Sequence, residues 1–251
     1  RPPVREGGLG DGAALYPSPA VRTTRGDLGP SRSGPKGGAE GAVSYDEPML
    51  RLLTAGESHG KALVGVLEGL PAGIPVSPKE IAAELARRRH GYGRSGRQRL
   101  EGDRFEIVSG VLHGLTLRSP IGVTVETAEW DRKYRDLMSV EGEADPPERL
   151  RRPRPGHADL AGAQKYGFDD VRNVLERASA RETAMRVALG VFCKALLAEL
   201  GIAVVSHVVR IGKVAVRSTR MPRPEDLETI DASPVRCLDE VVADRMVAEI
   251  D

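Results

Sequence analysis

Three features are scarce in this sequence: aromatic side chains, cysteines and net charge. Aromatic residues make up 4% of the 251 positions, which is few for a protein that stacks single-stranded nucleic acid on its surface. The formal net charge is +1, so no overall field favours nucleic acid or an anionic membrane. No stretch of about 18 apolar residues occurs, and we therefore expect no membrane span.

The cysteines and histidines are spaced too widely for the common metal motifs. Cys193 and Cys237 form no C-x-x-C pair, which leaves zinc and redox motifs unsupported. The spacing of a zinc site is also missing from His59, His113, His157 and His207. We therefore expect no metal, and a reduced, cytoplasmic setting fits the two thiols.

Residues 1–48 differ in composition from the rest of the chain. Glycine and proline occupy 17 of these 48 positions, and no helical or strand periodicity is present, which predicts a disordered tail. The segment has no apolar signal-peptide core, and its acidic residues are unlike a transit peptide. We expect residues 49–251 to form the domain, since a chain of this length can bury a substantial core.

The remaining sequence predicts a mixture of strands and helices. Apolar runs and β-branched alternation predict strands at 49–54, 63–70, 105–113, 121–127 and 202–211. We expect the third and fourth of these to pair. Helices are predicted at 78–89 and 179–200, because each opens on a capping-box pattern. Residues 129–153 are predicted to form a long irregular surface segment.

The first predicted strand is followed by Gly56-Glu57-Ser58-His59-Gly60. An imidazole at such a turn can reach a ligand, and its ordinary pKa suits proton transfer near neutral pH. The alternative is a turn whose histidine is solvated or hydrogen-bonded to the backbone. A serine hydrolase is disfavoured, because adjacent side chains leaving a strand diverge and the serine would not reach its base.

Arginines gather in two loops rich in glycine or proline, at 91–99 and 151–159. Arg94 and Arg97 lie in the first loop, and Arg154 lies in the second beside His157. Guanidinium groups suit the bidentate recognition of phosphate and carboxylate. With two loop histidines to move protons, this composition indicates a small polyanionic substrate.

Two helix ends also carry arginines. The start of the 179–200 helix, flanked by Arg177 and Arg181, could hold an anion. The alternative there is ordinary capping with arginines that face solvent. Residues 87–89 are three arginines in the last turn of the first helix, and we assign two of them to interactions with the helix dipole and solvent.

From Met49 onward the chain resembles chorismate synthase, the last enzyme of the shikimate pathway. Three blocks carry the resemblance: GESHG at 56–60, ARRRHGYGR at 86–94 extended to Arg97, and RPGHAD at 154–159 continued by ERASARETA at 176–184. The resemblance implies an α+β fold, a β-α-β sandwich with helices between largely antiparallel sheets. It also implies a homotetramer.

The resemblance further implies a lyase reaction, the 1,4-anti elimination of phosphate from 5-enolpyruvylshikimate 3-phosphate to give chorismate. Reduced FMN is required, with NADPH as a candidate source of the reducing equivalents. By the family's motifs, His59 is the general acid near the leaving phosphate and His157 stands near the flavin. The remaining matches are substrate contacts at Arg88, Arg94, Arg97 and Arg154, nicotinamide-nucleotide contacts at Arg88 and Arg94, and flavin contacts at Arg177, Ala178 and Ser179.

The resemblance runs to Asp251, and we expect the family's C-terminal segment, with further flavin and substrate contacts, to be missing. The alternative from another class is therefore an inactive truncated fragment that binds flavin or anions. An arginine-rich nucleic-acid module is disfavoured by the near-zero net charge and the few aromatic residues.

Overall fold

The computed structural model describes residues 50–93, 102–141, 149–218 and 220–251. The chain divides into two units, Arg1–Ser44 and Tyr45–Asp251, and every described residue belongs to the second. The predicted tail at 1–48, as well as Arg94 and Arg97, lies outside the described residues.

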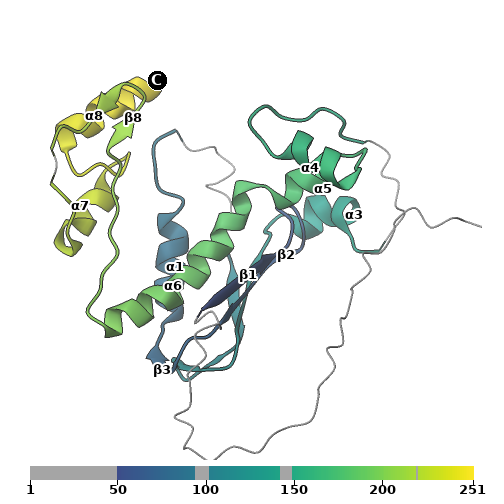
Figure 1. The fold of residues 1–251 in the computed structure, drawn as a ribbon, viewed down its shortest axis with the longest axis horizontal. Coiled ribbons are helices and arrows are strands. Elements are labelled where there is room, and N and C mark those ends of the chain that lie inside the picture. The colour runs from purple at the N-terminus through teal and green to yellow at the C-terminus, as the bar shows by residue number, and fades with distance from the viewer. Residues whose placement is uncertain (1–49, 94–101, 142–148, 219) are drawn as a thin grey trace, which may run out of the picture. The chain divides into compact units, whose positions relative to one another are not determined.

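A four-stranded antiparallel sheet forms the centre of the second unit (Figure 1). Its strands are β1 (Arg51–Ala55), β2 (Ala62–Glu68), β7 (Ile121–Glu126) and β4 (Phe105–Ser109), in that spatial order. Side chains alternate along each strand, so one face presents buried residues that include Leu63, Leu67, Val123 and Val125. The predicted pairing of the third and fourth strands is confirmed by the β4–β7 ladder.

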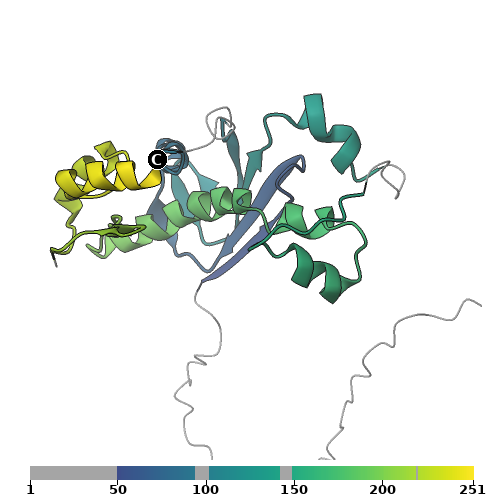
Figure 2. The same cartoon turned by 90° about the horizontal axis from the view of Figure 1, so that it is seen from above.

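Two helices cover the buried face of this sheet. Helix α6 (Thr183–Glu199) contacts β2, β7 and helix α1 (Pro78–Arg87), and Figure 2 shows α6 running along the sheet. The predicted apolar stripe of α6 is confirmed: Met185, Leu189 and Phe192 are fully buried in the core. The mixture of helices and antiparallel strands confirms the predicted α+β class.

A small second sheet interrupts the strand predicted at 105–113. The chain bends at Gly110, whose φ is +81° and where a Cβ would lie 2.6 Å from Ile121. Beyond it, β5 (Val111–Leu112) and β6 (Leu115–Leu117) form a hairpin that continues to β3 (Ala72–Pro75). The prediction of one continuous strand was therefore wrong at Gly110, where only a residue without a Cβ fits.

The two predicted capping boxes have different outcomes. The box at the start of α1 is confirmed, because the Ser77 hydroxyl and the Glu80 carboxylate both accept backbone hydrogen bonds. The box at Ser179 is not formed, since the chain makes a 3-10 turn, η2 (Ala180–Glu182), before α6. Ser179 still caps this turn, but Glu182 accepts a hydrogen bond from Thr54 at 2.6 Å instead.

The irregular segment predicted at 129–153 contains one short helical stretch, and its residues 142–148 lie outside the described residues. The chain forms a π-helical turn η1 (Trp130–Tyr134) and helix α3 (Arg135–Met138). Helices α4 (Asp159–Tyr166) and α5 (Arg172–Arg177) follow and pack on each other. The prediction was wrong at 130–138, whereas residues 139–141 and 149–153 contain no helix or strand.

The last part of the chain has a small core of its own. It contains β8 (Arg210–Ile211), β9 (Val214–Ala215), η3 (Pro224–Asp226), α7 (Leu227–Ala232) and α8 (Glu240–Ile250). The strand predicted at 202–211 was wrong for all but its last two residues. Val204 and Val209 are 57% and 55% exposed, and burial is what favours such runs as strands.

The described residues contain neither a membrane-spanning helix nor a group of metal ligands. None of the helices in these ranges combines the length and the apolar character that crossing a bilayer requires. In the same ranges, no three or more His, Cys, Asp or Glu side chains are grouped so as to hold a metal ion.

Gly65 of β2 provides a test of how tightly α6 packs on the sheet. A Cβ at this position would lie 2.3 Å from Met185 Sδ and 2.8 Å from Leu189 Cδ1, both on fully buried side chains. We expect Gly65→Ala to lower the free energy of unfolding by about 1–3 kcal/mol, the usual effect of overpacking. Urea denaturation measures this change.

The matched control is Gly190→Ala in the middle of α6, where an added Cβ meets no atom within 4 Å. This change should stabilise the protein by up to about 1 kcal/mol through helix propensity alone. Equal effects at the two positions would contradict the close approach of α6 to β2.

Candidate active site

His59 lies in the turn between β1 and β2, against the last turn of α5. Its Nδ1 is 2.7 and 2.8 Å from the two carboxylate oxygens of Glu176. The same carboxylate accepts hydrogen bonds from the Ser58 hydroxyl at 2.5 Å and from the His59 backbone N–H at 2.9 Å. The Ser58 N–H donates to the Glu176 carbonyl at 3.0 Å. One glutamate thus fastens the turn to the helix.

The Glu176 carboxylate is 5% exposed. Burial alone would raise the pKa of Glu176, but hydrogen bonds from His59 and Ser58 outweigh it and lower that pKa below its ordinary value. The group is therefore charged at neutral pH and can hold an imidazole. The alternative of a solvated or backbone-bonded His59 was wrong, because the partner is a buried carboxylate.

Ser58 and His59 converge on Glu176, although neighbouring side chains were predicted to diverge. Both residues lie on a turn rather than a strand, so the alternation of a strand does not apply. Ser58 Oγ is 3.3 Å from His59 Nδ1, the nitrogen that also faces Glu176. A catalytic triad instead places the serine and the acid on opposite ring nitrogens. This geometry therefore gives no support to a serine hydrolase.

Tyr134 packs against the His59 ring. Their ring centroids are 4.3 Å apart and the rings are tilted by 39°. Tyr134 is 8% exposed and ends the π-helical turn η1, and such turns are frequent at functional sites. The His59 side chain remains 17% exposed, and the described residues place no hydrogen-bond partner at its Nε2.

The junction between α5 and α6 lies next to this cluster. Arg177 follows Glu176 directly and donates from Nη2 to the Thr54 carbonyl at 2.7 Å and to the Thr54 hydroxyl at 2.9 Å. Arg177 and Ala178 are exposed, while Ser179 is half-buried. The predicted flavin-contacting residues therefore form an accessible surface beside the His59 turn.

Arg181 does not belong to that accessible surface, although it was predicted to flank the helix start. Its side chain is 6% exposed, forms an ion pair with Asp103 and donates to the Glu126 carbonyl at 3.1 Å. The alternative of a solvent-facing arginine was wrong as well, because the guanidinium is directed into the protein.

A second cluster joins Arg154, His157 and Asp159 at the start of α4. Asp159 Oδ2 accepts hydrogen bonds from the Arg154 backbone at 3.0 Å and from its Nε at 3.2 Å. His157 Nδ1 contacts Asp159 Oδ1, and Arg154 Nη2 lies 3.1 Å from His157 Nε2. The Asp159 side chain is fully buried, whereas those of Arg154 and His157 are 49% and 23% exposed.

Asp159 is held as a carboxylate by its neighbours. Burial alone would raise the pKa of Asp159, but hydrogen bonds from Arg154 and His157 outweigh it and lower that pKa. A buried charge of this kind is stable only because it is paired and hydrogen-bonded. The carboxylate therefore orients the exposed arginine and imidazole.

Arg88 belongs to a third cluster, centred on Asp103. Arg88 Nη1 is 3.2 Å and Arg89 Nε is 3.9 Å from Asp103, which also pairs with Arg181. The Asp103 side chain is 1% exposed. One buried carboxylate thus faces three guanidinium groups, and it fixes the orientation of Arg88.

The assignment of two of the three arginines at 87–89 to solvent was wrong. Arg87 pairs with Glu84 at 2.9 Å and with Asp231 at 3.0 Å. Arg88 and Arg89 turn to Asp103, and the three side chains are only 21%, 14% and 28% exposed. They link helix α1 to other elements, so the helix dipole is a minor part of their role.

The predicted site residues thus occupy separate clusters. No hydrogen bond or ion pair joins His59 to His157 in the ranges that the structure describes. Helix α4, which follows His157, packs closely on α5, which carries the His59 partner Glu176. A Cβ on Gly162 of α4 would lie 2.4 Å from Val174 Cγ1 of α5. Arg88 stands apart at Asp103, and Arg94 and Arg97 lie outside the described residues.

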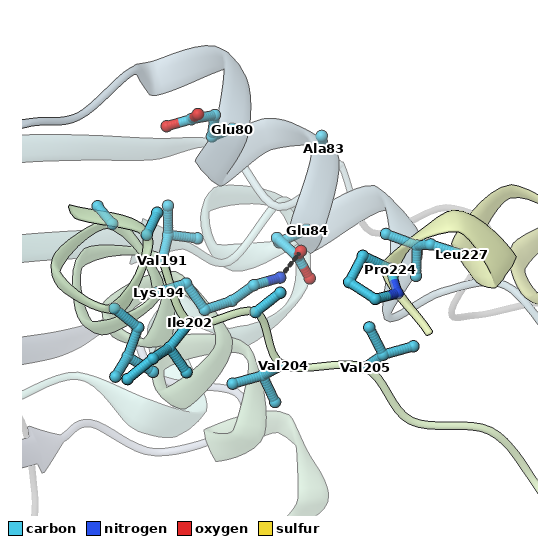
Figure 3. Close-up of a pocket in the computed structure, with 14 residues that line it drawn as sticks. Glu80, Ala83, Glu84, Val191, Lys194, Ile202, Val204, Val205, Pro224 and Leu227 are labelled. Atoms are coloured by element: carbon cyan, nitrogen blue, oxygen red, sulfur yellow. Dashed lines mark hydrogen bonds and ion pairs between the residues drawn. The ribbon is translucent and has the colours of Figure 1, made fainter. Parts of the chain in front are cut away.

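A pocket of about 370 Å³ lies elsewhere, between α1, α6 and residues 202–205 (Figure 3). Its lining is largely apolar and includes Val191 and Ile202, with the Glu84–Lys194 ion pair at 2.5 Å as its charged feature. Among the residues that the structure describes, none of the predicted site residues lines this pocket.

The prediction missed the carboxylates and one aromatic residue that organise the site. They are Glu176, Asp159, Asp103 and Tyr134. Glu176 and Asp159 stand inside the sequence blocks that carry the arginines and histidines, so proximity in sequence was an available signal. Asp103 and Tyr134 gave no such signal, because folding alone brings them to Arg88 and His59.

Comparison with known proteins gives a consistent result. The family model for chorismate synthase matches residues 50–251. The chorismate synthase of Leifsonia xyli subsp. xyli is 56% identical over 212 residues, or 81% of this chain and 52% of that protein. The chorismate synthase of Salinispora tropica is 56% identical over 81% of this chain and 54% of that protein. The chain therefore spans about half the length of these curated relatives.

A solved structure agrees with the sequence relatives. The crystal structure of a chorismate synthase superposes with a TM-score of 0.62 at 40% identity, covering 80% of this chain and 53% of the other. The predicted fold of the chorismate synthase type is confirmed by this match.

The buried charge of Asp159 can be tested through the pH dependence of stability. We expect Asp159→Asn to lower the free energy of unfolding at pH 7 by about 1–3 kcal/mol, since it weakens the hydrogen bonds to Arg154 and His157. The pKa of Asp159 is lowered in the folded protein. The stability that this carboxylate contributes is therefore complete above its ordinary pKa of about 3.9, and it is lost as the pH falls through the folded-state pKa. Denaturation of both proteins between pH 7 and 3 measures the difference.

The control is Asp169→Asn, which removes a carboxylate that is 82% exposed and pairs with Arg149 at 3.4 Å. Exposed pairs contribute little, so this variant should match the wild-type protein at every pH. A constant stability deficit of Asp159→Asn down to pH 3 would show that its charge is not the stabilising feature.

Proposed function

Since the chain belongs to the chorismate synthase family, we propose that it carries the N-terminal part of a chorismate synthase active site. The reaction is the 1,4-anti elimination of phosphate from 5-enolpyruvylshikimate 3-phosphate, which gives chorismate. This makes the protein a lyase that cleaves a carbon–oxygen bond to phosphate. The observation that carries the proposal is His59, which Glu176 holds through Nδ1 while the side chain remains 17% exposed.

His59 is the general acid in this proposal. Departure of phosphate builds negative charge on the leaving oxygen, and a positioned imidazolium can neutralise it by giving up a proton. Its 17% exposure leaves a path to a ligand, while Glu176 and Tyr134 hold the ring. The neighbouring Arg177 adds positive charge at the same place.

Arginines bind the substrate in this proposal. The substrate carries a phosphate and two carboxylates, and guanidinium groups supply both charge and orientation. Arg154 is half-exposed and oriented by Asp159, and Arg88 is oriented by Asp103 at 3.2 Å. Arg94 and Arg97 are assigned to the same role on sequence alone.

The α5–α6 junction fits the cofactor that the family implies. Reduced FMN carries a phosphate, and when bound it supplies an electron transiently and assists C–H cleavage. The exposed guanidinium of Arg177, the exposed Ala178 and the hydroxyl of Ser179 offer charge and polar groups for such a ligand. His157, held by Asp159, would stabilise the negative charge of the reduced flavin. NADPH as reductant is assigned to Arg88 and Arg94.

Assembly and location complete the proposal. We place the protein in the cytoplasm as a homotetramer. Exposed apolar residues support an assembly surface on the sheet face opposite α6, where Leu53 and Val64 are 66% and 41% exposed. The alternative of an inactive flavin- or anion-binding fragment has no observation that favours it, and the assay below separates the two.

The decisive assay mixes the protein anaerobically with reduced FMN and 5-enolpyruvylshikimate 3-phosphate and follows phosphate release and chorismate absorbance. It is run on this chain and on this chain joined to the remaining length of the Leifsonia xyli relative. We expect product from the joined protein, and His59→Ala should lower kcat by about 100-fold or more.

His113→Asn is the control for His59→Ala. His113 sits in the β5–β6 turn at φ +50°, a conformation that asparagine tolerates, so this variant should retain full activity. Product from this chain alone would exclude the inactive-fragment alternative. No product from either protein, or equal rates for His59→Ala and wild type, would refute the proposed function.

Flavin binding gives a test that does not depend on turnover. We expect Arg177→Ala to weaken binding of FMN to the joined protein by about tenfold or more, since a charged hydrogen bond to phosphate is lost. Quenching of flavin fluorescence measures the affinity. The control is Arg186→Ala, another exposed arginine near the start of α6, which pairs with Glu182 at 2.9 Å. Equal affinities for both variants would remove Arg177 from the flavin site.

A further inference from the structure

We propose that Glu176 is a positioning residue that keeps the proton of neutral His59 on Nδ1 and so reserves Nε2 for proton transfer. The direction of that transfer depends on the function proposed above. The tautomer itself follows from the contacts of this chain and can be tested without any ligand.

The chemistry of the carboxylate fixes the tautomer. An ionised carboxylate can only accept hydrogen bonds. His59 Nδ1 lies 2.7 and 2.8 Å from its two oxygens, so a hydrogen must stand on Nδ1 for the contact to be attractive. An unprotonated Nδ1 would instead bring its lone pair against a buried negative charge.

The other donors to Glu176 reinforce this arrangement. The Ser58 hydroxyl donates at 2.5 Å and the His59 backbone N–H at 2.9 Å. Because the Ser58 proton is directed to Glu176, the hydroxyl has no proton to give to Nδ1 across their 3.3 Å separation. The carboxylate is thereby kept charged, which is the state that demands a protonated Nδ1.

The ring itself cannot turn freely. Tyr134 packs on its face at 4.3 Å between centroids, and the His59 backbone is tied to Glu176 through its N–H. The titratable groups that contact the ring are Glu176 from α5 and Tyr134 from η1, and the ammonium of Lys133 lies 5.1 Å from the Tyr134 ring centroid. A flip that exchanged the two nitrogens would break the contact with Glu176.

The proton that His59 transfers must therefore leave from Nε2. The imidazolium carries protons on both nitrogens, and the one on Nε2 passes to the leaving phosphate as the carbon–oxygen bond breaks and its electron pair departs with the phosphate. His59 is left neutral with its remaining proton on Nδ1, which is the tautomer that Glu176 stabilises. Without Glu176 the ring could settle with its proton on Nε2 and Nδ1 bare.

The test reads the tautomer of His59 directly. The 251-residue chain is labelled with ¹⁵N-histidine, and the ring nitrogen shifts are recorded at a pH where His59 is neutral, with His59→Gln identifying its signals. We expect the Nδ1–H form in the wild-type protein. In Glu176→Gln the amide can either accept or donate, so the ratio of the two tautomers should change by about tenfold toward Nε2–H.

Three further variants sharpen the test. Glu176→Asp keeps an acceptor-only group and should retain the Nδ1–H form. Ser58→Ala leaves the carboxylate in place and should retain it too. Glu84→Gln is the matched control, since Glu84 is also a partly buried glutamate held by cations, Arg87 and Lys194, and should not affect His59.

Two results would overturn the proposal: an Nε2–H tautomer in the wild-type protein, or an unchanged tautomer in folded Glu176→Gln. The first needs no variant, so the test stands even if Glu176→Gln fails to fold. In the joined protein, Glu176→Gln should lower kcat by about tenfold or more with little change in KM, because ring orientation rather than binding is altered. Confirmed tautomers without any enzymatic product would uphold the role of Glu176 while refuting the proposed function.

Discussion

The buried carboxylate of Glu176 connects two parts of the chain that are more than a hundred residues apart. It accepts hydrogen bonds from Ser58 and from both the backbone and the ring of His59. Such a group is costly to bury unless each of its lone pairs is used. The turn between β1 and β2 must therefore take one conformation, and the position of His59 follows from it. The adjacent Arg177 is placed by the same helix end, where it reaches Thr54.

The same principle recurs at the other two clusters. Asp159 is fully buried and directs Arg154 and His157, while Asp103 faces Arg88, Arg89 and Arg181. In each case the acid is buried, and except for the buried Arg181 its basic partners are at least partly exposed. A carboxylate accepts hydrogen bonds but cannot donate them, so it does not bind an anion itself. It can therefore orient the arginine or histidine and leave that side chain to bind the anion.

The sequence predicted most of the sheet and helices α1 and α6, because period-two and capping patterns are local signals, but it did not predict helix α8. It placed His59, Arg154 and His157 in loops correctly. It failed where tertiary contacts decide: the run of valines before Arg210 finds no partner strand, and Glu182 leaves its capping position for Thr54. It also could not show that Asp103 meets Arg181, since these residues are far apart in sequence and joined only by the fold.

The pairing of buried acids with basic groups also bears on the proposed function, in which a chain of nearly neutral net charge binds a polyanion. The net charge of +1 averages 37 basic against 36 acidic residues, but the average conceals where each sign lies. Arg177 at the α5–α6 junction and Arg154 beside Asp159 are exposed basic groups. Charge placed locally would act on an anion that binds beside it more strongly than the overall charge of the protein. In the proposed function, the three buried carboxylates therefore decide how the basic groups that meet the substrate are oriented.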